Sequence, residues 1–289
     1  MIYLLTFDVE DWFHVLDHEA TRNEEQWNRY PSRLKPGVEK ILSLLDKHSV
    51  KATFFCLGWI ARKYPEVIRE IVRHGHSIGC HSDMHQLVYE QTETEFKNDL
   101  DRAIKSIEDI IGEKVRCYRA PGFSITDGTP WAFETLLHAG IEIDSSVFPA
   151  RRAHGGYTSF PSGTPALITM KGMILKEFPV NIRSVFTRPL VFSGGGYFRL
   201  FPYPLIKKFS LETSYIMTYF HPRDFDPDQP VIPGLTMKRR FKSYYGIKGS
   251  LKKLDRWLSD FSFSDIDSAN LLLNWDRVPQ IEIGRSIKI

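Results

Sequence analysis

The sequence predicts an α/β fold whose parallel strands form a (β/α) barrel. Strand-like and helix-like segments alternate at least five times along the chain, which is typical of a parallel sheet with crossover helices. Polar residues also gather where predicted strands end, near residues 8, 81, 119, 144 and 221. In (β/α) barrels the active site lies at the carboxyl ends of several strands, whereas an open sheet binds its ligand at one switch point. The sequence therefore favours the barrel.

Apolar and β-branched runs predict the strands, and apolar stripes with helical spacing predict the helices. The predicted strands cover residues 2–7, 50–57, 76–80, 115–118, 141–143, 173–180 and 214–220. The predicted helices cover 36–48, 60–74, 92–111, 129–140, 203–211 and 250–261. We expect loops at 12–34, where they form a rim over a site, and at 150–170, and a turn at 194–196.

Composition places the chain among ordinary globular proteins. Its 289 residues are 42% hydrophobic and 25% charged, with a formal net charge of +3, which is too small to predict nucleic-acid binding. A basic run at 238–242 reads as a solvated loop, with contact to an anionic substrate as the alternative. The three cysteines lack metal-type spacing and predict reduced thiols. We find no signal peptide or membrane-span pattern and expect a cytoplasmic protein.

Two histidines form the most informative motif. His81 and His85 are four residues apart on a turn or short helix, so both imidazoles can reach one metal ion. Two histidines make an incomplete catalytic site, because such a metal usually has a third protein ligand and one position for water. The sequence therefore predicts a divalent metal site, with zinc favoured. A third protein ligand must come from another part of the chain.

Three acids at the end of the first predicted strand can supply that ligand. Asp8, Glu10 and Asp11 follow an apolar run, and crowded buried acids repel one another unless a cation or proton holds them. Glu10 shares the side of Asp8 on an extended strand, whereas Asp11 requires the chain to turn first. We favour Glu10 slightly and keep both residues as candidate ligands.

These motifs, in this order, resemble the NodB-type polysaccharide deacetylases, a carbohydrate esterase type, and in particular the branch found with exopolysaccharide and exosortase loci. The resemblance covers most of the chain and is strongest over residues 3–150. It implies a single domain over 1–289 with a helical C-terminal extension. It also implies a distorted (β/α) barrel of seven strands. Most members carry two adjacent aspartates where this chain has Asp8-Val9-Glu10-Asp11, which keeps the division between base and ligand open.

The resemblance also assigns roles to residues. Asp8 matches the general base, His81 and His85 the metal-binding pair, and Arg119 the residue that holds the base. His221 matches the general acid, and Asp144 the acid that tunes it. The chemistry agrees, because amide hydrolysis at neutral pH needs an activated water and a proton for the departing amine.

The predicted function is therefore metal-dependent removal of N-acetyl groups from an N-acetylated sugar or polysaccharide intermediate in exopolysaccharide biosynthesis. One alternative is an allantoinase-like hydrolase of small amides with the same fold. Another is a carbohydrate-binding protein that has lost catalysis, which the joint presence of Asp8, Arg119 and His221 disfavours. The expected partner is a carbohydrate substrate. The sequence leaves the sugar, the metal and a homo-oligomeric state open.

Overall fold

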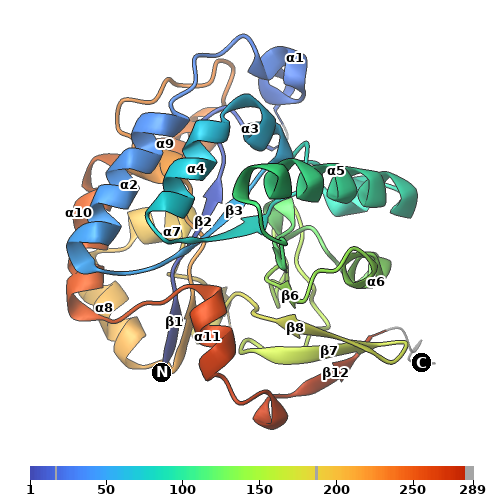
Figure 1. The fold of residues 1–289 in the computed structure, drawn as a ribbon. Helices are drawn as coiled ribbons and strands as arrows, with labels where there is room; N and C mark the ends of the chain where they lie inside the picture. Colours follow the sequence, from blue (N-terminus) through green and yellow to red (C-terminus); the bar gives the residue numbers. More distant parts are fainter. Residues whose placement is uncertain (17, 186–187, 284–289) are drawn as a thin grey trace. The chain divides into compact units, whose positions relative to one another are not determined.

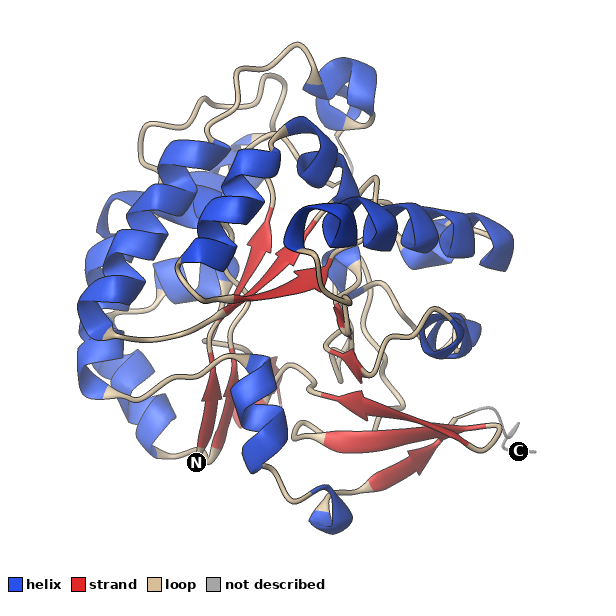
Figure 2. Ribbon diagram, viewed as in Figure 1, coloured by secondary structure: helices blue, strands red, loops and turns tan. Residues whose placement is uncertain are grey.

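The structure is a computed structural model that describes residues 1–16, 18–185 and 188–283. The chain divides into two compact units that are described separately. The first unit comprises Met1–Phe54, Tyr64–Ser77 and Val191–Ala269. The second comprises Phe55–Lys63, Ile78–Leu190 and Asn270–Ile289. Figures 1 and 2 show the helices and strands of both units.

The first unit is built on short parallel strands with helices around them. Its strands are β1 (Ile2–Leu4), β2 (Thr6–Val9), the start of β3 (Thr53–Cys56) and β11 (Tyr215–Met217). Its helices are α1 (Glu24–Trp27), α2 (Leu34–His48), α4 (Pro65–Arg73), α7 (Gly195–Leu200), α8 (Tyr203–Leu211), η4 (Pro222–Phe225), α9 (Met237–Tyr244), α10 (Ile247–Asp260) and most of α11 (Ile266–Leu272). β1 pairs in parallel with β11, and Phe7 forms a further parallel bridge with Phe220. These pairings bring the end of β2 and the segment after β11 together.

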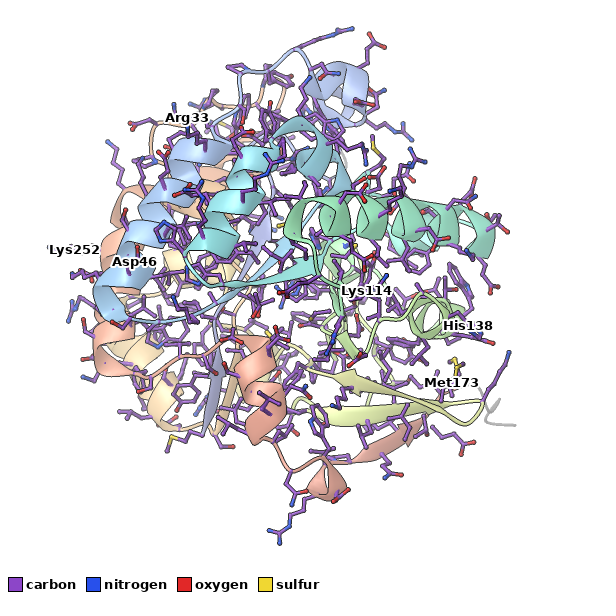
Figure 3. All side chains as sticks on the ribbon, in the orientation of Figure 1. Arg33, Asp46, Lys114, His138, Met173 and Lys252 are labelled. Atoms are coloured by element: carbon purple, nitrogen blue, oxygen red, sulfur yellow. The ribbon has the colours of Figure 1, made fainter. Side chains whose placement is uncertain are left out.

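The apolar stripe predicted for α2 is the side of this helix that packs against the rest of the first unit. Val38, Ile41, Leu42 and Leu45 are buried, as their helical spacing indicates. The helix ends at Ser49, whose φ of 53° is left-handed. Exposed polar side chains lie on the outer surfaces of the helices, for example Asp46 on α2 and Lys252 on α10 (Figure 3).

The second unit contains a larger sheet whose strands run in the order β12-β7-β8-β6-β5-β4. Its elements are α3 (Gly58–Lys63), β4 (Ser77–Cys80), α5 (Glu93–Ile111), β5 (Cys117–Tyr118), α6 (Trp131–His138), β6 (Ile143–Asp144), β7 (Ala166–Met170), β8 (Met173–Glu177), β9 (Arg183–Val185), β10 (Arg188–Leu190) and β12 (Gln280–Glu282). β4, β5, β6 and β8 pair in parallel, whereas β7 and β8 form an antiparallel hairpin. α5 begins at the Thr92–Glu95 capping box and ends at Gly112, as predicted.

Several sequence predictions are wrong in detail. The helix predicted at 60–74 is interrupted before Pro65, because proline lacks an N–H and clashes with the carbonyl four residues earlier, so α3 and α4 are separate. The loop predicted at 150–170 contains β7, whose burial depends on its pairing with β8. The turn predicted at 194–196 opens α7, and the basic loop predicted at 238–242 is α9. In both cases tertiary contacts outweigh the weak local preference.

The predicted α/β class with parallel strands is confirmed. A closed ring of strands is not found among the described residues, which is compatible with the distorted form of the predicted barrel. In the described part of the chain, no helix combines the length and apolar character needed to span a bilayer.

Two helical glycines allow a test of packing. A Cβ at Gly58 would lie 2.2 Å from Asp83 Oδ1 and 2.7 Å from Ala103 Cα, whereas a Cβ at Gly249 has no heavy atom within 4 Å. We expect Gly58→Ala to lower the free energy of unfolding by about 1–3 kcal/mol, because the added methyl group would overlap atoms that are already packed. Gly249→Ala, the matched control, should raise it by ~0.5–1 kcal/mol. Urea denaturation measures both, and equal effects would contradict the packing at α3.

Candidate active site

In the first unit, a backbone hydrogen bond places Asp8 beside His221. Asp8 N donates to Phe220 O at 2.7 Å, and Phe220 N donates to Thr6 O at 3.2 Å. Because β2 and the segment after β11 run in parallel, their carboxyl ends meet at the same edge. The acids that follow β2 therefore lie next to the histidine that follows Phe220.

Asp8, Glu10 and His221 form a compact cluster within this unit. One ligand atom from each residue lies within 4.8 Å of the other two. His221 Nε2 is 3.9 Å from Asp8 Oδ2 and 3.7 Å from Glu10 Oε1, and both carboxylates are buried. Burial lowers the pKa of His221, but the charges of Glu10, Asp224 and Asp8 outweigh burial and raise this pKa to about 9. The imidazole is therefore cationic at neutral pH, the form that donates a proton.

Asp224 supports the other side of the imidazole. Its Oδ2 lies 3.1 Å from His221 Nδ1 and accepts the His221 backbone N–H at 2.9 Å. Arg199 lies 3.1 Å from Asp224 Oδ1, and both side chains are buried. Burial alone would raise the pKa of Asp224. The positive charges of Arg199 and His221 lower this pKa by more than burial raises it, so the net shift is downward. The sequence analysis missed this carboxylate; its signal was an acid three residues after His221, the spacing of a capping box.

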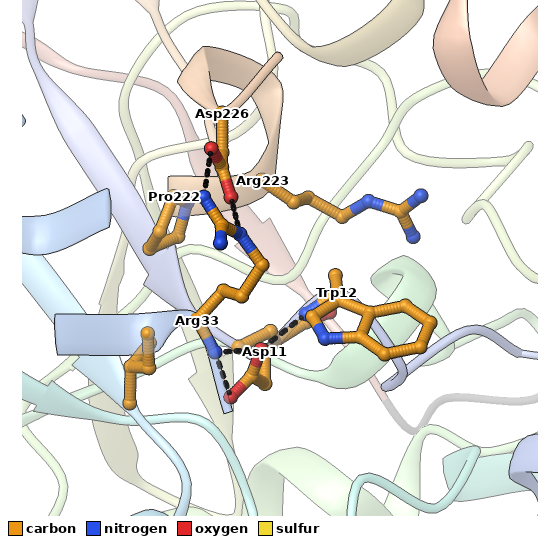
Figure 4. Close-up of a pocket in the computed structure, with 8 residues that line it drawn as sticks. Asp11, Trp12, Arg33, Pro222, Arg223 and Asp226 are labelled. Carbon is orange, nitrogen blue, oxygen red and sulfur yellow. Dashed lines mark hydrogen bonds and ion pairs between the residues drawn. The ribbon is translucent and has the colours of Figure 1, made fainter. Parts of the chain in front are cut away.

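Asp11 has a different environment from Glu10. Its carboxylate accepts the backbone N–H groups of Trp12 at 2.8 Å and Arg33 at 3.1 Å, and also the hydroxyl of Ser32. Burial raises the pKa of Asp11, while these hydrogen bonds act to lower it. Asp11 thus joins the end of β2 to the start of α2, as Figure 4 shows for its bonds with Trp12 and Arg33.

A small, shallow pocket adjoins these acids. It is lined by Glu10, Asp11, Trp12, Arg33, Leu34, Pro222, Arg223 and Asp226. Arg33 pairs with Asp226 across it, with Nη2 2.9 Å from Oδ1. The pocket therefore lies directly beside the predicted catalytic histidine, between the loop after β2 and η4.

In the second unit, His81 and His85 lie on the turn that follows β4. Their ring centroids are 5.5 Å apart, and both side chains are buried. The turn is not helical, since Ser82 and His85 adopt φ values of 68° and 54°, conformations that concentrate at functional sites. His81 Nδ1 lies 2.7 Å from Arg119 O, which acts as its acceptor and places the lone pair of the ring on Nε2.

Buried acids hold this turn in place. Asp99 accepts the backbone N–H groups of Asp83 at 2.7 Å and Met84 at 3.0 Å. Burial raises the pKa of Asp99 to about 6, although these hydrogen bonds oppose the shift. Asp83 in turn makes a two-pronged ion pair with Arg62, at 2.5 and 3.1 Å. The two histidines are thus carried by a turn with fixed geometry.

Arg119 and Asp144 also belong to the second unit. Arg119 is fully buried after β5, and its guanidinium donates to Ser145 Oγ at 3.0 Å and lies 4.2 Å from the Phe55 ring. Asp144 Oδ1 accepts the Ser146 hydroxyl at 2.6 Å. Burial raises the pKa of Asp144, against its hydrogen bonds to neighbouring groups. The tuning of His221 by Asp144 stays a prediction, since the carboxylate observed on the His221 Nδ1 atom is Asp224.

Glu177 is a second residue that sequence reasoning missed. It pairs with Asp144 across β6 and β8, is fully buried, and accepts the Val147 N–H at 3.2 Å. Burial and then the neighbouring charge of Asp144 raise the pKa of Glu177 well above its ordinary value. The available signal was an acidic residue inside the mostly apolar predicted strand 173–180. Burial therefore favours the protonated form of both neighbouring carboxyl groups.

Two family models match the chain. One is described as polysaccharide deacetylase and matches residues 4–138, and the other is described as a domain of unknown function (DUF3473) and matches residues 145–270. The first of these matches places residues 4–138 in the carbohydrate deacetylase class. More particularly, these residues form a polysaccharide deacetylase domain of the NodB type.

Curated relatives agree over part of their length. The chain is 34% identical over 96 residues to the peptidoglycan-N-acetylglucosamine deacetylase of Bacillus cereus. These 96 residues are 33% of this chain and 35% of that protein. It is 35% identical over 82 residues to the chitooligosaccharide deacetylase of Azorhizobium caulinodans, covering 28% of this chain and 39% of that protein. The chain thus spans between about a third and two fifths of the length of these relatives.

Solved structures share the fold. A putative polysaccharide deacetylase from Mycobacterium smegmatis superposes with a TM-score of 0.68 at 20% identity, covering 99% of this chain and 94% of that one. A CE4 family pseudoenzyme from Bacillus anthracis superposes with a TM-score of 0.51 at 13% identity, covering 98% and 69% of the two chains.

The Asp144–Glu177 pair predicts how stability depends on pH. Because the pKa of Glu177 is raised in the folded protein, the folded state keeps a proton that the unfolded state releases. Stability should therefore fall as pH rises from about 4.5 through the folded pKa, by at most about 1.4 kcal/mol per pH unit. Glu177→Gln should remove much of this fall, because an amide mimics the protonated acid. Glu142→Gln, at an exposed glutamate before β6, is the control. Unfolding by urea at several pH values measures the slopes, and parallel curves for wild type and Glu177→Gln would contradict the raised pKa of Glu177.

Proposed function

We propose that this chain is a metal-dependent hydrolase that removes N-acetyl groups from an N-acetylated sugar or polysaccharide intermediate. The observation that carries the proposal is the buried cluster of Asp8, Glu10 and His221, in which two carboxylates face a cationic imidazole. A carboxylate base and an imidazolium acid are the two groups that amide hydrolysis requires. The peptidoglycan and chitooligosaccharide deacetylases among the relatives make N-acetylglucosamine glycans the first substrates to test.

The donor set fits a divalent metal, with zinc favoured. The His81 ring has its lone pair on Nε2, because Arg119 O accepts from Nδ1, and this arrangement is typical of metal-binding histidines. We propose His81, His85 and one acid after β2 as the ligands. Glu10 is favoured over Asp11 because the Asp11 carboxylate already accepts hydrogen bonds from Trp12, Ser32 and Arg33. A bound metal would lower the pKa of a water and polarise the acetyl carbonyl.

The remaining roles belong to side chains of the chain itself. Asp8 takes the proton of the attacking water, with Arg119 proposed to keep its carboxylate ionised. His221 gives its Nε2 proton to the departing amine. Asp224 holds the imidazole through Nδ1 and favours its cationic form, and Arg199 keeps Asp224 ionised. Asp144 remains a proposed support of the same site from the second unit.

One assay tests the function as a whole. Acetate release should be measured on N-acetylated oligosaccharides, small acetamides and allantoin, with and without added zinc, cobalt or manganese. We expect metal-dependent release from the oligosaccharides. Turnover of allantoin alone would favour the small-amide alternative. Glycan binding without turnover under every metal condition would indicate a carbohydrate-binding protein that has lost catalysis.

Three variants of neighbouring acids separate their roles. We expect Glu10→Gln to lose the metal, whereas Asp8→Asn keeps it and loses ~10²–10⁴-fold in kcat, the usual contribution of a general base. Asp11→Asn should mainly lower stability, because it weakens the bonds that hold the start of α2. Metal analysis and thermal unfolding measure these outcomes, with His81→Ala/His85→Ala as the metal-free reference. Metal retained in Glu10→Gln but lost in Asp11→Asn would reverse the ligand assignment.

His221 should act in the transition state. We expect His221→Ala to lower kcat by ~10²–10⁴-fold with little change in KM, because the departing amine needs a proton only as the bond breaks. In Asp224→Asn the basic limb of the kcat–pH profile should move to lower pH, since the imidazolium loses a neighbouring negative charge. Asp144→Asn is the comparison. If only Asp144→Asn moves the limb, then Asp144 and not Asp224 tunes His221.

A further inference from the structure

Exposed apolar and basic side chains share a surface on α7 and α9 of the first unit. We call it the basic–apolar face, and its members are Tyr197, Leu200, Met237, Phe241, Tyr245, Lys238, Arg240 and Lys242. Met237 is 87% exposed, Phe241 54% and Tyr245 49%. Because these three are spaced by four residues along α9, they lie on one side, and the rings of Phe241 and Tyr245 are 4.7 Å apart. Tyr197 and Leu200 on α7 are also exposed.

The two helices of this face are in direct contact. Arg199 of α7 donates to Ser243 O at 2.7 Å and to Lys242 O at 3.1 Å, at the end of α9. The exposed apolar side chains of α7 therefore belong to the same part of the unit as those of α9. Single exposed apolar residues are ordinary, but an extended group of them indicates an interaction surface.

The cations of the face lack acidic partners. Lys238, Arg240 and Lys242 are exposed, and none forms an ion pair with any residue that the structure describes. α9 carries no acidic residue, so its charges are not balanced within the helix. A helix with apolar residues on one side and lysine and arginine beside them is typical of segments that lie at a membrane surface.

Two residues of α9, Arg239 and Tyr244, fix this helix to the surroundings of the candidate active site. Tyr244 OH accepts the Ile232 N–H at 3.0 Å, and the Arg223 guanidinium lies 5.7 Å from the Tyr244 ring. Arg223 is two residues after His221 and lines the pocket beside Glu10. Arg239 donates to Leu16 O, which attaches α9 to the loop after β2. The basic–apolar face is thus the outer surface of the rim around this pocket.

We propose that the basic–apolar face binds the surface of a lipid bilayer that contains anionic headgroups. The cations match the phosphates, and the apolar side chains enter the boundary between headgroups and acyl chains. A soluble acidic polymer would match the cations but would leave Met237 and Phe241 in water. Resting on the proposed function, a further consequence is that the glycan reaches the candidate site at the bilayer surface; the binding itself does not depend on catalysis.

Vesicle flotation of the full chain tests the proposal. We expect binding to vesicles of phosphatidylcholine with phosphatidylglycerol, little binding to phosphatidylcholine alone, and weakening by salt. Met237→Ser/Phe241→Ser should lose most of the binding. Lys238→Gln/Arg240→Gln/Lys242→Gln should weaken it on the order of five-fold for each cation removed.

Two matched controls separate this face from general effects. Leu271→Ser/Leu272→Ser removes two exposed apolar side chains elsewhere, and Lys97→Gln/Lys105→Gln/Lys114→Gln removes the same net charge from α5 and the residues after it. Both should bind like wild type, and thermal unfolding should show that every variant is folded.

Three results would overturn the proposal. The first is no binding to anionic vesicles by a folded protein. The second is an equal loss in the face variants and in their controls. The third is competition by dextran sulfate together with unchanged binding in Met237→Ser/Phe241→Ser, which would indicate an acidic polymer as the ligand. Vesicle binding without acetate release would disprove the proposed function alone.

Discussion

The hydrogen bond from Asp8 N to Phe220 O is the interaction on which the candidate site of the first unit depends. It sets the register between β2 and the segment after β11, and a slip of one residue would turn every side chain of β2 to the other face. Asp8 and Glu10 would then leave the neighbourhood of His221. The chemistry of the cluster therefore rests on a backbone pairing that any residue with an N–H could make.

Several buried carboxylates of the described residues are paired with an arginine. Arg199 accompanies Asp224, Arg33 accompanies Asp226, and Arg62 accompanies Asp83. An ionised group without such a partner would cost several kcal/mol to bury. Asp144 and Glu177 lie beside each other, and burial raises the pKa of both carboxyl groups and so favours their protonated forms.

The sequence predicted the parts of the structure that depend on local pattern. The stripe of α2 and the capping box of α5 required no knowledge of the rest of the fold. β7 could not be found in this way, because its burial depends on the β8 hairpin. Asp224 and Glu177 were missed for a related reason. The role of each acid depends on the buried residue beside it, His221 or Asp144, and that neighbour is known only from the fold. The roles assigned to Asp8, Arg119 and His221 came from the family resemblance and remain predictions.

The groups that orient His81 and His221 differ in whether a substitution can remove them. His81 is oriented by the carbonyl of Arg119, which survives replacement of the arginine side chain. His221 is oriented by the side chain of Asp224, which a single codon change abolishes. Under mutational drift the proposed metal binding would therefore be the more durable property, and the proposed proton donation the more fragile. A lineage that lost activity in this way would pass through a form that still binds metal and no longer turns over substrate.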